Sequence, residues 1–231
     1  MTTLESGRPR VDADPGVYTP QQDTWMLCDA VAASGAAHGA RVLDMCTGSG
    51  AVAIAAARAG AREVVAFDLS PRAVECASRN AAAAGFDVDV RLGSFIEALT
   101  VPPFDVLLCN PPYVPSPDTP AGTGLERAWN AGTDGRFVLD PLCENAHRLL
   151  NPGGVLLVVQ SDCADPARTL TLLSESGFAA RVVAAQRHRF GPVMASRAPY
   201  LAAEGHIAPG ADTEKFVVIE AHLTSSNAGT Q

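Results

Sequence analysis

Short apolar runs alternate along most of the chain with longer segments in which apolar residues recur at helical spacing. The runs that read as strands lie at residues 41–45, 63–68, 87–92, 104–108, 155–159, 180–185 and 216–221. The segments that read as helices lie at residues 26–31, 51–59, 71–84, 139–149 and 167–176. Because strands and helices take turns, the pattern predicts an α/β fold with a mostly parallel sheet, helices on both faces and ligands at the carboxyl ends of the strands.

The same pattern predicts how the chain is divided. Residues 1–16 read as a flexible N-terminal arm, residues 17–224 as a single domain, and residues 225–231 as a flexible tail. Residues 189–214 read as a long loop between the last two strands, and this loop is either a partner-docking flap or a tolerated surface loop. The helix at 26–31 would be capped by Asp23 or Thr24.

Composition narrows the function classes. The 231 residues are 47% apolar, which is enough for one substantial core. A net charge of -8 disfavours nucleic acid as the main partner, because phosphate binding rests on Lys and Arg. No run has the apolar core of a signal peptide or the roughly 18 apolar residues that span a bilayer, so we expect a cytoplasmic protein. The six cysteines lack paired spacing, which predicts reduced, mostly buried residues and no metal site.

A glycine turn follows the first strand, and an acid ends the second. Gly48 and Gly50 let a ligand approach the backbone at a helix N-terminus, where free N–H groups favour an anionic or polar group. Asp68 follows the turn by about 20 residues, where doubly wound folds bind ribose hydroxyls, although it is also placed to cap the next helix. Ser94 and Asn110 also follow strands, so these residues predict a ligand site at one edge of the sheet.

The tetrapeptide Asn110-Pro111-Pro112-Tyr113 follows the fourth strand. Its prolines fix the backbone and remove two N–H donors, which leaves a rigid rim of acceptor oxygens beside an aromatic ring. Such a rim is able to hold a planar –NH2 group: the Asn110 side-chain oxygen and the Pro111 carbonyl accept its hydrogens while Tyr113 stacks on its plane. The alternative is that the two prolines merely end a strand.

Three motifs resemble the HemK type of class I S-adenosylmethionine-dependent methyltransferases, which methylate the glutamine N5 of the Gly-Gly-Gln motif in translation release factors. The motifs are the turn from Asp44 to Gly50, the acid Asp68, and the tetrapeptide from Asn110 to Tyr113. Residues 18–24 and 124–135 resemble the short single-domain branch, whose eukaryotic and archaeal members act with a small activating partner. The resemblance implies a Rossmann-like class I methyltransferase fold, with a seven-stranded sheet whose last strand is antiparallel.

The resemblance also implies the cofactor S-adenosyl-L-methionine and residues for both ligands. Its cofactor-binding residues would be Thr24, Asp44, Cys46, Thr47, Gly48, Gly50, Asp68, Leu69, Ser94, Phe95 and Asn110. Asn110, Pro111 and Tyr113 would be catalytic, and Asn110, Pro111, Pro112, Tyr113, Glu126 and Trp129 would bind the substrate. Ser94 stands where many relatives have an acid. Trp129 is alternatively a core anchor, and Glu126 a solvated charge.

The implied activity is methyl transfer to a planar amide or amino nitrogen, above all a glutamine side chain of a release-factor-like protein, with a small activating partner. Three alternatives remain open at this point. One is an N-methyltransferase of a small molecule or peptide, and another is a nucleic-acid adenine N6-methyltransferase, which the acidic balance disfavours. The third is a cofactor-binding subunit without catalysis.

Overall fold

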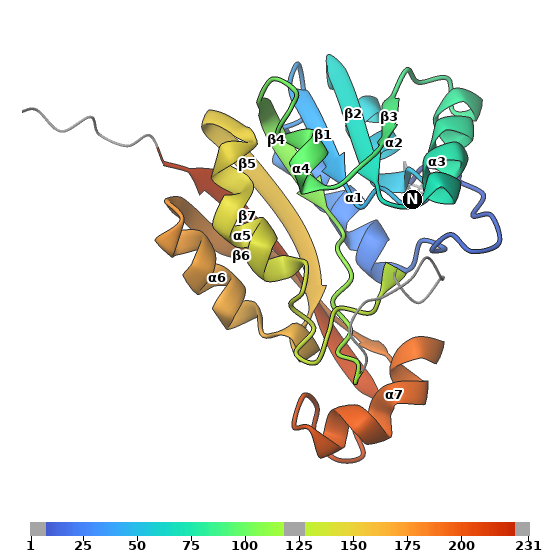
Figure 1. Ribbon diagram of the computed structural model, residues 1–231, viewed down its shortest axis with the longest axis vertical. Coiled ribbons are helices and arrows are strands. Elements are labelled where there is room, and N and C mark those ends of the chain that lie inside the picture. Colours follow the sequence, from blue (N-terminus) through green and yellow to red (C-terminus); the bar gives the residue numbers. More distant parts are fainter. Residues whose placement is uncertain (1–7, 118–127, 225–231) are drawn as a thin grey trace, which may run out of the picture.

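The computed structural model describes residues 8–117 and 128–224, which fold around one seven-stranded sheet (Figure 1). In the order β3-β2-β1-β4-β5-β7-β6, all neighbouring pairs from β3 to β5 are parallel, and β7 runs antiparallel between β5 and β6. The strands are β1 (Arg41–Met45), β2 (Glu63–Asp68), β3 (Asp89–Leu92), β4 (Phe104–Cys109), β5 (Leu150–Ser161), β6 (Phe178–Arg189) and β7 (Thr213–Leu223). The predicted mostly parallel sheet with an antiparallel last strand is confirmed.

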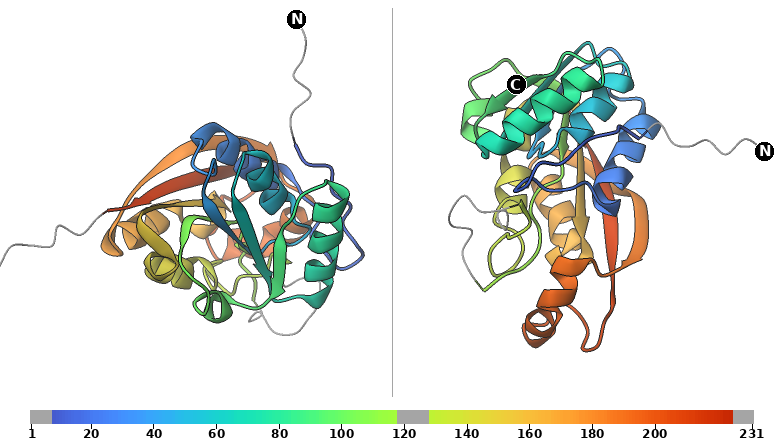
Figure 2. Two further views of the ribbon diagram at one scale, coloured as in Figure 1. Left: turned by 90° about the horizontal axis from the view of Figure 1, so that it is seen from above. Right: turned by 90° about the vertical axis from the view of Figure 1, so that its right-hand side faces the viewer.

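Helices cover the two faces of this sheet (Figure 2). They are α1 (Gln22–Ser34), α2 (Ala51–Arg58), α3 (Pro71–Ala83), α4 (Phe95–Ala98), α5 (Leu139–Asn145), α6 (Pro166–Glu175) and α7 (Pro192–Ala203). Helix α1 packs beside α2 and α2 beside α3, whereas α5 packs beside α6. Small residues on α2 such as Ala53 and Ala56 are buried, so this helix lies close to the strands.

The segment 189–214, which the sequence predicts to be a long loop, contains helix α7. Pro192 occupies its first turn, where the missing N–H has no partner to lose, and Met194 and Leu201 are buried against the domain. Strands β6 and β7 pair from Phe178 and Leu223 to Arg189 and Thr213 and thereby extend well beyond their predicted bounds. Because α7 follows the end of β6, it lies beyond the edge at which the parallel strands end (Figure 1).

The N-terminal helix also differs from its prediction. It begins at Gln22, after an extended Gln21 that makes no side-chain capping bond, so neither Asp23 nor Thr24 caps it. Both residues lie in the first turn and are buried. The short helix α4 was not predicted; Ser94 caps it through a hydrogen bond from Ile96 N.

Residues 8–16, from the arm predicted to be flexible, and Val17, the first residue of the predicted domain, lie near α3 and the glycine turn. Asn80 of α3 donates to the carbonyl oxygens of Asp12 (2.9 Å) and Ser49 (2.8 Å), and its own side-chain oxygen accepts from Asp12 N. Arg79 pairs with Asp14, and Val17 is buried in this region. The arm therefore leads the chain directly into the glycine-turn region.

The segment after the β4 tetrapeptide is held by the buried guanidinium of Arg136. It donates to Asp140 Oδ1 (2.6 Å), Thr169 Oγ1 (3.0 Å) and the Asp165 carbonyl (2.9 Å), and also to the Ala164 carbonyl. These bonds join the loop to α5 and α6.

All six cysteines are free and five are buried, as predicted. No helix within the described ranges has the length and apolar character needed to cross a bilayer.

Candidate active site

A cavity of about 1150 Å³ opens where β1, β2, β3 and β4 end. Nine of the predicted cofactor residues line it: Thr24, Cys46, Thr47, Gly48, Asp68, Leu69, Ser94, Phe95 and Asn110. Asp44 and Gly50 do not reach its wall; both are buried beneath the turn and shape it from below. A cavity therefore lies at the edge of the sheet where the sequence predicts a ligand site.

The glycine turn has a backbone that few side chains permit. Cys46, Gly48 and Gly50 all have positive φ angles, of 60°, 56° and 85°. A Cβ on Gly50 would lie 3.1 Å from Ala77 Cα, so this glycine lets α2 approach α3. Around Gly48, in contrast, a Cβ would meet nothing within 4 Å. Glycine is favoured at position 48 because the turn needs a left-handed backbone there, and not because a side chain would clash.

Two carboxylates hold this turn. Asp68 accepts from Gly48 N (2.9 Å) and Ser70 N (2.9 Å), so its side chain ties the turn to the start of α3. Asp44 accepts from Thr47 Oγ1 at 2.6 Å. Complete burial raises the pKa of Asp44 to about 7, against the lowering effect of the Thr47 hydroxyl. The Asp68 carboxyl group thus lies at the wall of the cavity, whereas the Asp44 carboxyl group is buried beneath the turn.

Exposed apolar side chains form another part of the wall. Leu69, Ile96 and Phe137 are 51%, 71% and 55% exposed, and all three line the cavity. Apolar groups gathered at a concave site favour a flat, apolar ligand. The Ser94 hydroxyl lies nearby, but it donates to Glu97 Oε2 (2.6 Å) and accepts from Ile96 N. The predicted hydrogen bond from an adenine amine to the Ser94 hydroxyl would compete with the bond by which Ser94 caps α4.

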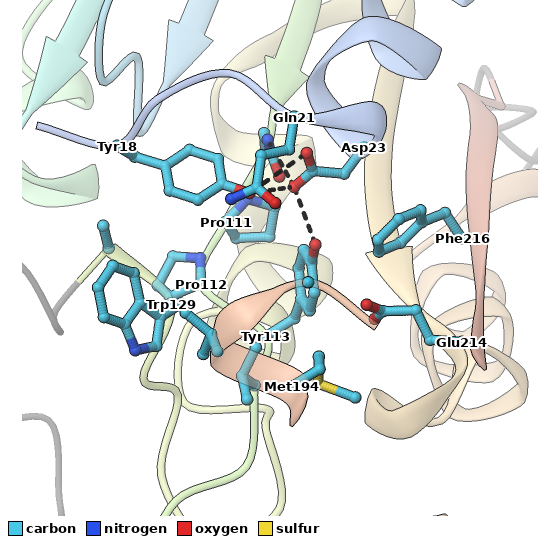
Figure 3. A pocket seen from close by; sticks show the side chains of 15 residues that line it. Tyr18, Gln21, Asp23, Pro111, Pro112, Tyr113, Trp129, Met194, Glu214 and Phe216 are labelled. Carbon is cyan, nitrogen blue, oxygen red and sulfur yellow. Dashed lines mark hydrogen bonds between the residues drawn. The ribbon is translucent and has the colours of Figure 1, made fainter. Parts of the chain in front are cut away.

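The tetrapeptide is organised by a buried carboxylate, that of Asp23 (Figure 3). Asp23 Oδ2 accepts from Tyr113 Oη (2.8 Å), Tyr18 Oη (3.2 Å) and Asn110 Nδ2 (3.3 Å). Asn110 Nδ2 also donates to Thr24 Oγ1 (3.1 Å). Because a carboxylate only accepts hydrogen bonds, the nitrogen of the Asn110 amide must face Asp23, and its oxygen Oδ1 must face away.

A second pocket, of about 50 Å³, adjoins the large cavity, and we call it the acceptor pocket. It shares Tyr18, Asn110, Pro112 and Ala128 with the cavity. Its other walls come from Pro111, Tyr113 and Trp129, and from Met194 on α7 and Glu214 and Phe216 on β7 (Figure 3). Phe216 packs edge-on against Tyr113, with 6.3 Å between ring centroids. Helix α7 is thus a wall of this pocket.

The structure brings together all but one of the predicted substrate residues. Asn110, Pro111, Pro112, Tyr113 and Trp129 line the acceptor pocket, and the half-buried Trp129 also packs against the core. Glu126 lies outside the described residues. Sequence reasoning missed Ile96, Phe137, Glu214 and the central role of Asp23. The sequence offers a signal for Asp23 alone, because Tyr18, Gln22 and Trp25 give its segment an unusual number of polar and aromatic side chains. Ile96, Phe137 and Glu214 stand in ordinary surroundings that do not mark them as site residues.

Comparisons with known proteins place the chain among its relatives. The family model described as the methyltransferase small domain matches residues 10–125. A putative protein N5-glutamine methyltransferase of Methanocaldococcus jannaschii is 32% identical over 181 residues, covering 78% of this chain and 90% of the relative. A release factor glutamine methyltransferase of Deinococcus radiodurans is 37% identical over 179 residues, covering 74% of this chain and 63% of the relative. The chain thus spans less than two thirds of the latter.

Among solved structures, the Mtq2–Trm112 complex of E. cuniculi is responsible for methylation of the eRF1 translation termination factor. It matches with a TM-score of 0.62 and 23% identity, covering 91% of this chain and 100% of that chain. At this identity the likeness concerns the fold, which is that of the class I methyltransferases. The chain belongs to the methyltransferase small-domain family, and the expected cofactor of this class is S-adenosyl-L-methionine.

The cavity fits this cofactor. Exposed Leu69, Ile96 and Phe137 offer an apolar slot for a planar base, and the Asp68 carboxylate offers acceptors for sugar hydroxyls. The open side of Gly48 leaves room for close approach to the backbone. Asn110 lines both the cavity and the acceptor pocket, so a group bound beside it would face both.

Replacing Asp68 by alanine is predicted to weaken S-adenosylmethionine binding about tenfold or more, because charged hydrogen bonds to the ribose would be lost. Isothermal titration calorimetry measures the dissociation constant. Asp89→Ala, which removes an exposed carboxylate from β3, is the matched control and should bind normally. Unchanged affinity in Asp68→Ala would remove the ribose role.

Replacing Asp44 by asparagine is predicted to flatten the pH dependence of stability. A carboxyl whose pKa is raised from 3.8 to about 7 on folding binds protons more tightly in the folded state. The wild-type free energy of unfolding should therefore fall as pH rises from about 4 to about 7, by up to about 1.4 kcal/mol per pH unit, and then level off. Urea unfolding between pH 5 and 8 measures the slope. Parallel curves for the two proteins would contradict this role of Asp44.

Proposed function

We propose that the chain transfers the methyl group of S-adenosylmethionine to the side-chain amide nitrogen of a glutamine in a protein, such as a translation release factor. The observation that carries this proposal is the fixed orientation of Asn110. Its Nδ2 is committed to Asp23 and Thr24, so Oδ1 remains to accept a hydrogen bond from an acceptor. The Pro111 carbonyl is the second acceptor on the same rim.

The chemistry explains why a rim of acceptors is needed. S-adenosylmethionine supplies an electrophilic methyl group when it is bound. An amide nitrogen is a weak nucleophile, since its lone pair is delocalised, so the protein must orient it and exclude water. Asn110 Oδ1 and the Pro111 carbonyl would hold the two amide hydrogens. Both oxygens would also stabilise the positive charge that develops on nitrogen during transfer.

The acceptor pocket favours a neutral or donor-bearing group over an anion. Asp23 and Glu214 line it, and no Lys, Arg or His occurs among its described lining residues. A nucleic-acid acceptor would need cations for its phosphates. The charge of the pocket therefore supports a protein acceptor over adenine in a nucleic acid.

The relatives support a glutamine acceptor. The proteins from M. jannaschii and D. radiodurans are named for N5-glutamine and release factor glutamine methylation, and they share 32% and 37% identity with this chain. We further infer that the chain works in the cytoplasm with a small activating partner. The support for a partner is the fold neighbour from E. cuniculi, which forms a complex with Trm112.

Wild-type protein is predicted to methylate a synthetic peptide containing Gly-Gly-Gln, and Asn110→Ala should lose at least about 100-fold in kcat, because the oriented acceptor is lost. Transfer of a labelled methyl group and mass spectrometry of the peptide provide the measurement. The donor dissociation constant should stay within about threefold of wild type, since only one contact changes.

Asn145→Ala is the matched control, because Asn145 lines neither pocket and bonds to near neighbours in the chain: it donates to the Pro141 carbonyl and accepts from Arg148. It should retain wild-type turnover. If the wild type does not modify the peptide, either alone or with a partner of the Trm112 type, the proposed acceptor is wrong. If Asn110→Ala keeps wild-type turnover, the role of Asn110 is wrong.

Replacing Asp23 by asparagine is predicted to lower kcat by about 10-fold to 100-fold with little change in donor affinity. The new –NH2 group can donate to Asn110 Oδ1, which would rotate the amide and turn Nδ2 toward the acceptor. Steady-state kinetics with the peptide test this. Asp29→Asn makes the same change on the exposed side of α1 and should have no effect. Equal kcat in both variants would contradict a positioning role for Asp23.

A further inference from the structure

Glu214 is a buried, ionisable group of the acceptor pocket that the proposed chemistry leaves unused. It lies at the start of β7 and is 4% exposed, yet its Oε2 has no hydrogen-bond partner among the described residues. Burial, with smaller effects of Asp23 and Asp162, raises the pKa of Glu214 to about 7, although the Ser161 hydroxyl lowers it. A buried carboxyl oxygen without a donor is costly unless a ligand supplies that donor.

The position of Glu214 directs it to the acceptor rather than the donor. It lines the acceptor pocket with Asn110 and does not line the large cavity. Its carboxyl group points toward Tyr113 (Figure 3). Glu214 pairs with His188 of β6, and the pairing of β7 with β5 begins two residues further along, at Phe216. The backbone that carries Glu214 is thus held by one neighbouring strand. A group held this way is suited to select among ligands.

The other carboxyl group of the acceptor pocket, that of Asp23, already has its hydrogen-bond donors within the protein. Asp23 already accepts from Tyr18, Tyr113, Asn110 and Thr24. The free oxygen of Glu214 lacks a donor among the described residues, and the Asp23 carboxylate in the same pocket disfavours an anionic ligand. The pocket volume of about 50 Å³ admits only a few atoms. Its occupant must be a small, donor-bearing part of a larger acceptor.

We propose that Glu214 is a specificity-determining residue of the acceptor site, and that its carboxyl group accepts a backbone N–H of the polypeptide segment that carries the methyl-accepting glutamine. This inference rests on the proposed function. The two amide hydrogens of the glutamine are directed to Asn110 and Pro111, so a different N–H must reach Glu214. Glycines beside the glutamine have no side-chain donor, which leaves their backbone N–H groups.

The test combines a protein change with a peptide change. Glu214→Leu removes the acceptor, and N-methylglycine at either glycine of a Gly-Gly-Gln peptide removes one backbone N–H. In the wild type, one N-methylated peptide should have a KM about 10-fold or more above that of the parent, with kcat within about threefold. Glu214→Leu should raise the KM of the parent peptide similarly, and N-methylation should then add little.

Glu214→Gln keeps an acceptor oxygen without the charge, and its KM should lie between those of the wild type and Glu214→Leu. This variant also carries the test if Glu214→Leu does not fold. Calorimetry with S-adenosylmethionine should give wild-type affinity for each variant, because Glu214 does not line the donor cavity. Glu204→Gln, at an exposed position at the end of α7, is the matched control and should have wild-type KM.

Two results would overturn the inference while leaving the proposed function intact. One is a wild-type KM for both Glu214 variants. The other is an N-methylation penalty that is equal in the wild type and the variants, because independent effects add. A wild type that does not methylate the parent peptide would instead overturn the proposed function, and the inference would fall with it.

Discussion

The site depends on one buried carboxylate, that of Asp23, which needs hydrogen-bond donors from the residues around it. Asp23 is 1% exposed, and the hydroxyls of two tyrosines, the amide of Asn110 and the backbone of Thr24 all donate to it. Burial without those donors would be costly. The start of α1 and the end of β4 are therefore locked together at the junction of the two pockets. This lock makes the rim rigid before any ligand arrives, which is the preorganisation that electrostatic catalysis needs.

The two pockets are built by different means. The large cavity is shaped by the backbone of a turn with three left-handed residues, held by Asp68 through the N–H groups of Gly48 and Ser70, and by exposed apolar side chains. The acceptor pocket uses side chains that come from α1, the end of β4, α7 and β7. The parallel sheet makes both possible, because β1, β2 and β4 end at one edge. Arg136, which also lines the cavity, is fixed by its bonds to Asp140 and Thr169.

Most of the fold was predictable because its strands are buried apolar runs. Strand β2 has the predicted bounds, Glu63–Asp68, and β4 is one residue longer than predicted. Strands β6 and β7 were underestimated, because partner strands supply hydrogen bonds where the sequence is polar, as in the pair Arg187 and Lys215. The turn and Asn110 were found from their places at strand ends. Asp23 was not, since its bond to Asn110 joins residues 87 positions apart.

Helix α7 and the start of β7 lie outside residues 10–125, the part that matches the methyltransferase family. They nevertheless supply one wall of the acceptor pocket. The acceptor pocket thus combines residues inside the family match, such as Asn110 and Tyr113, with residues from the last fifth of the chain. Mutations that accumulate in the last fifth of the chain can therefore reshape one wall of the acceptor pocket during evolution, while the glycine turn and the tetrapeptide are inherited unchanged.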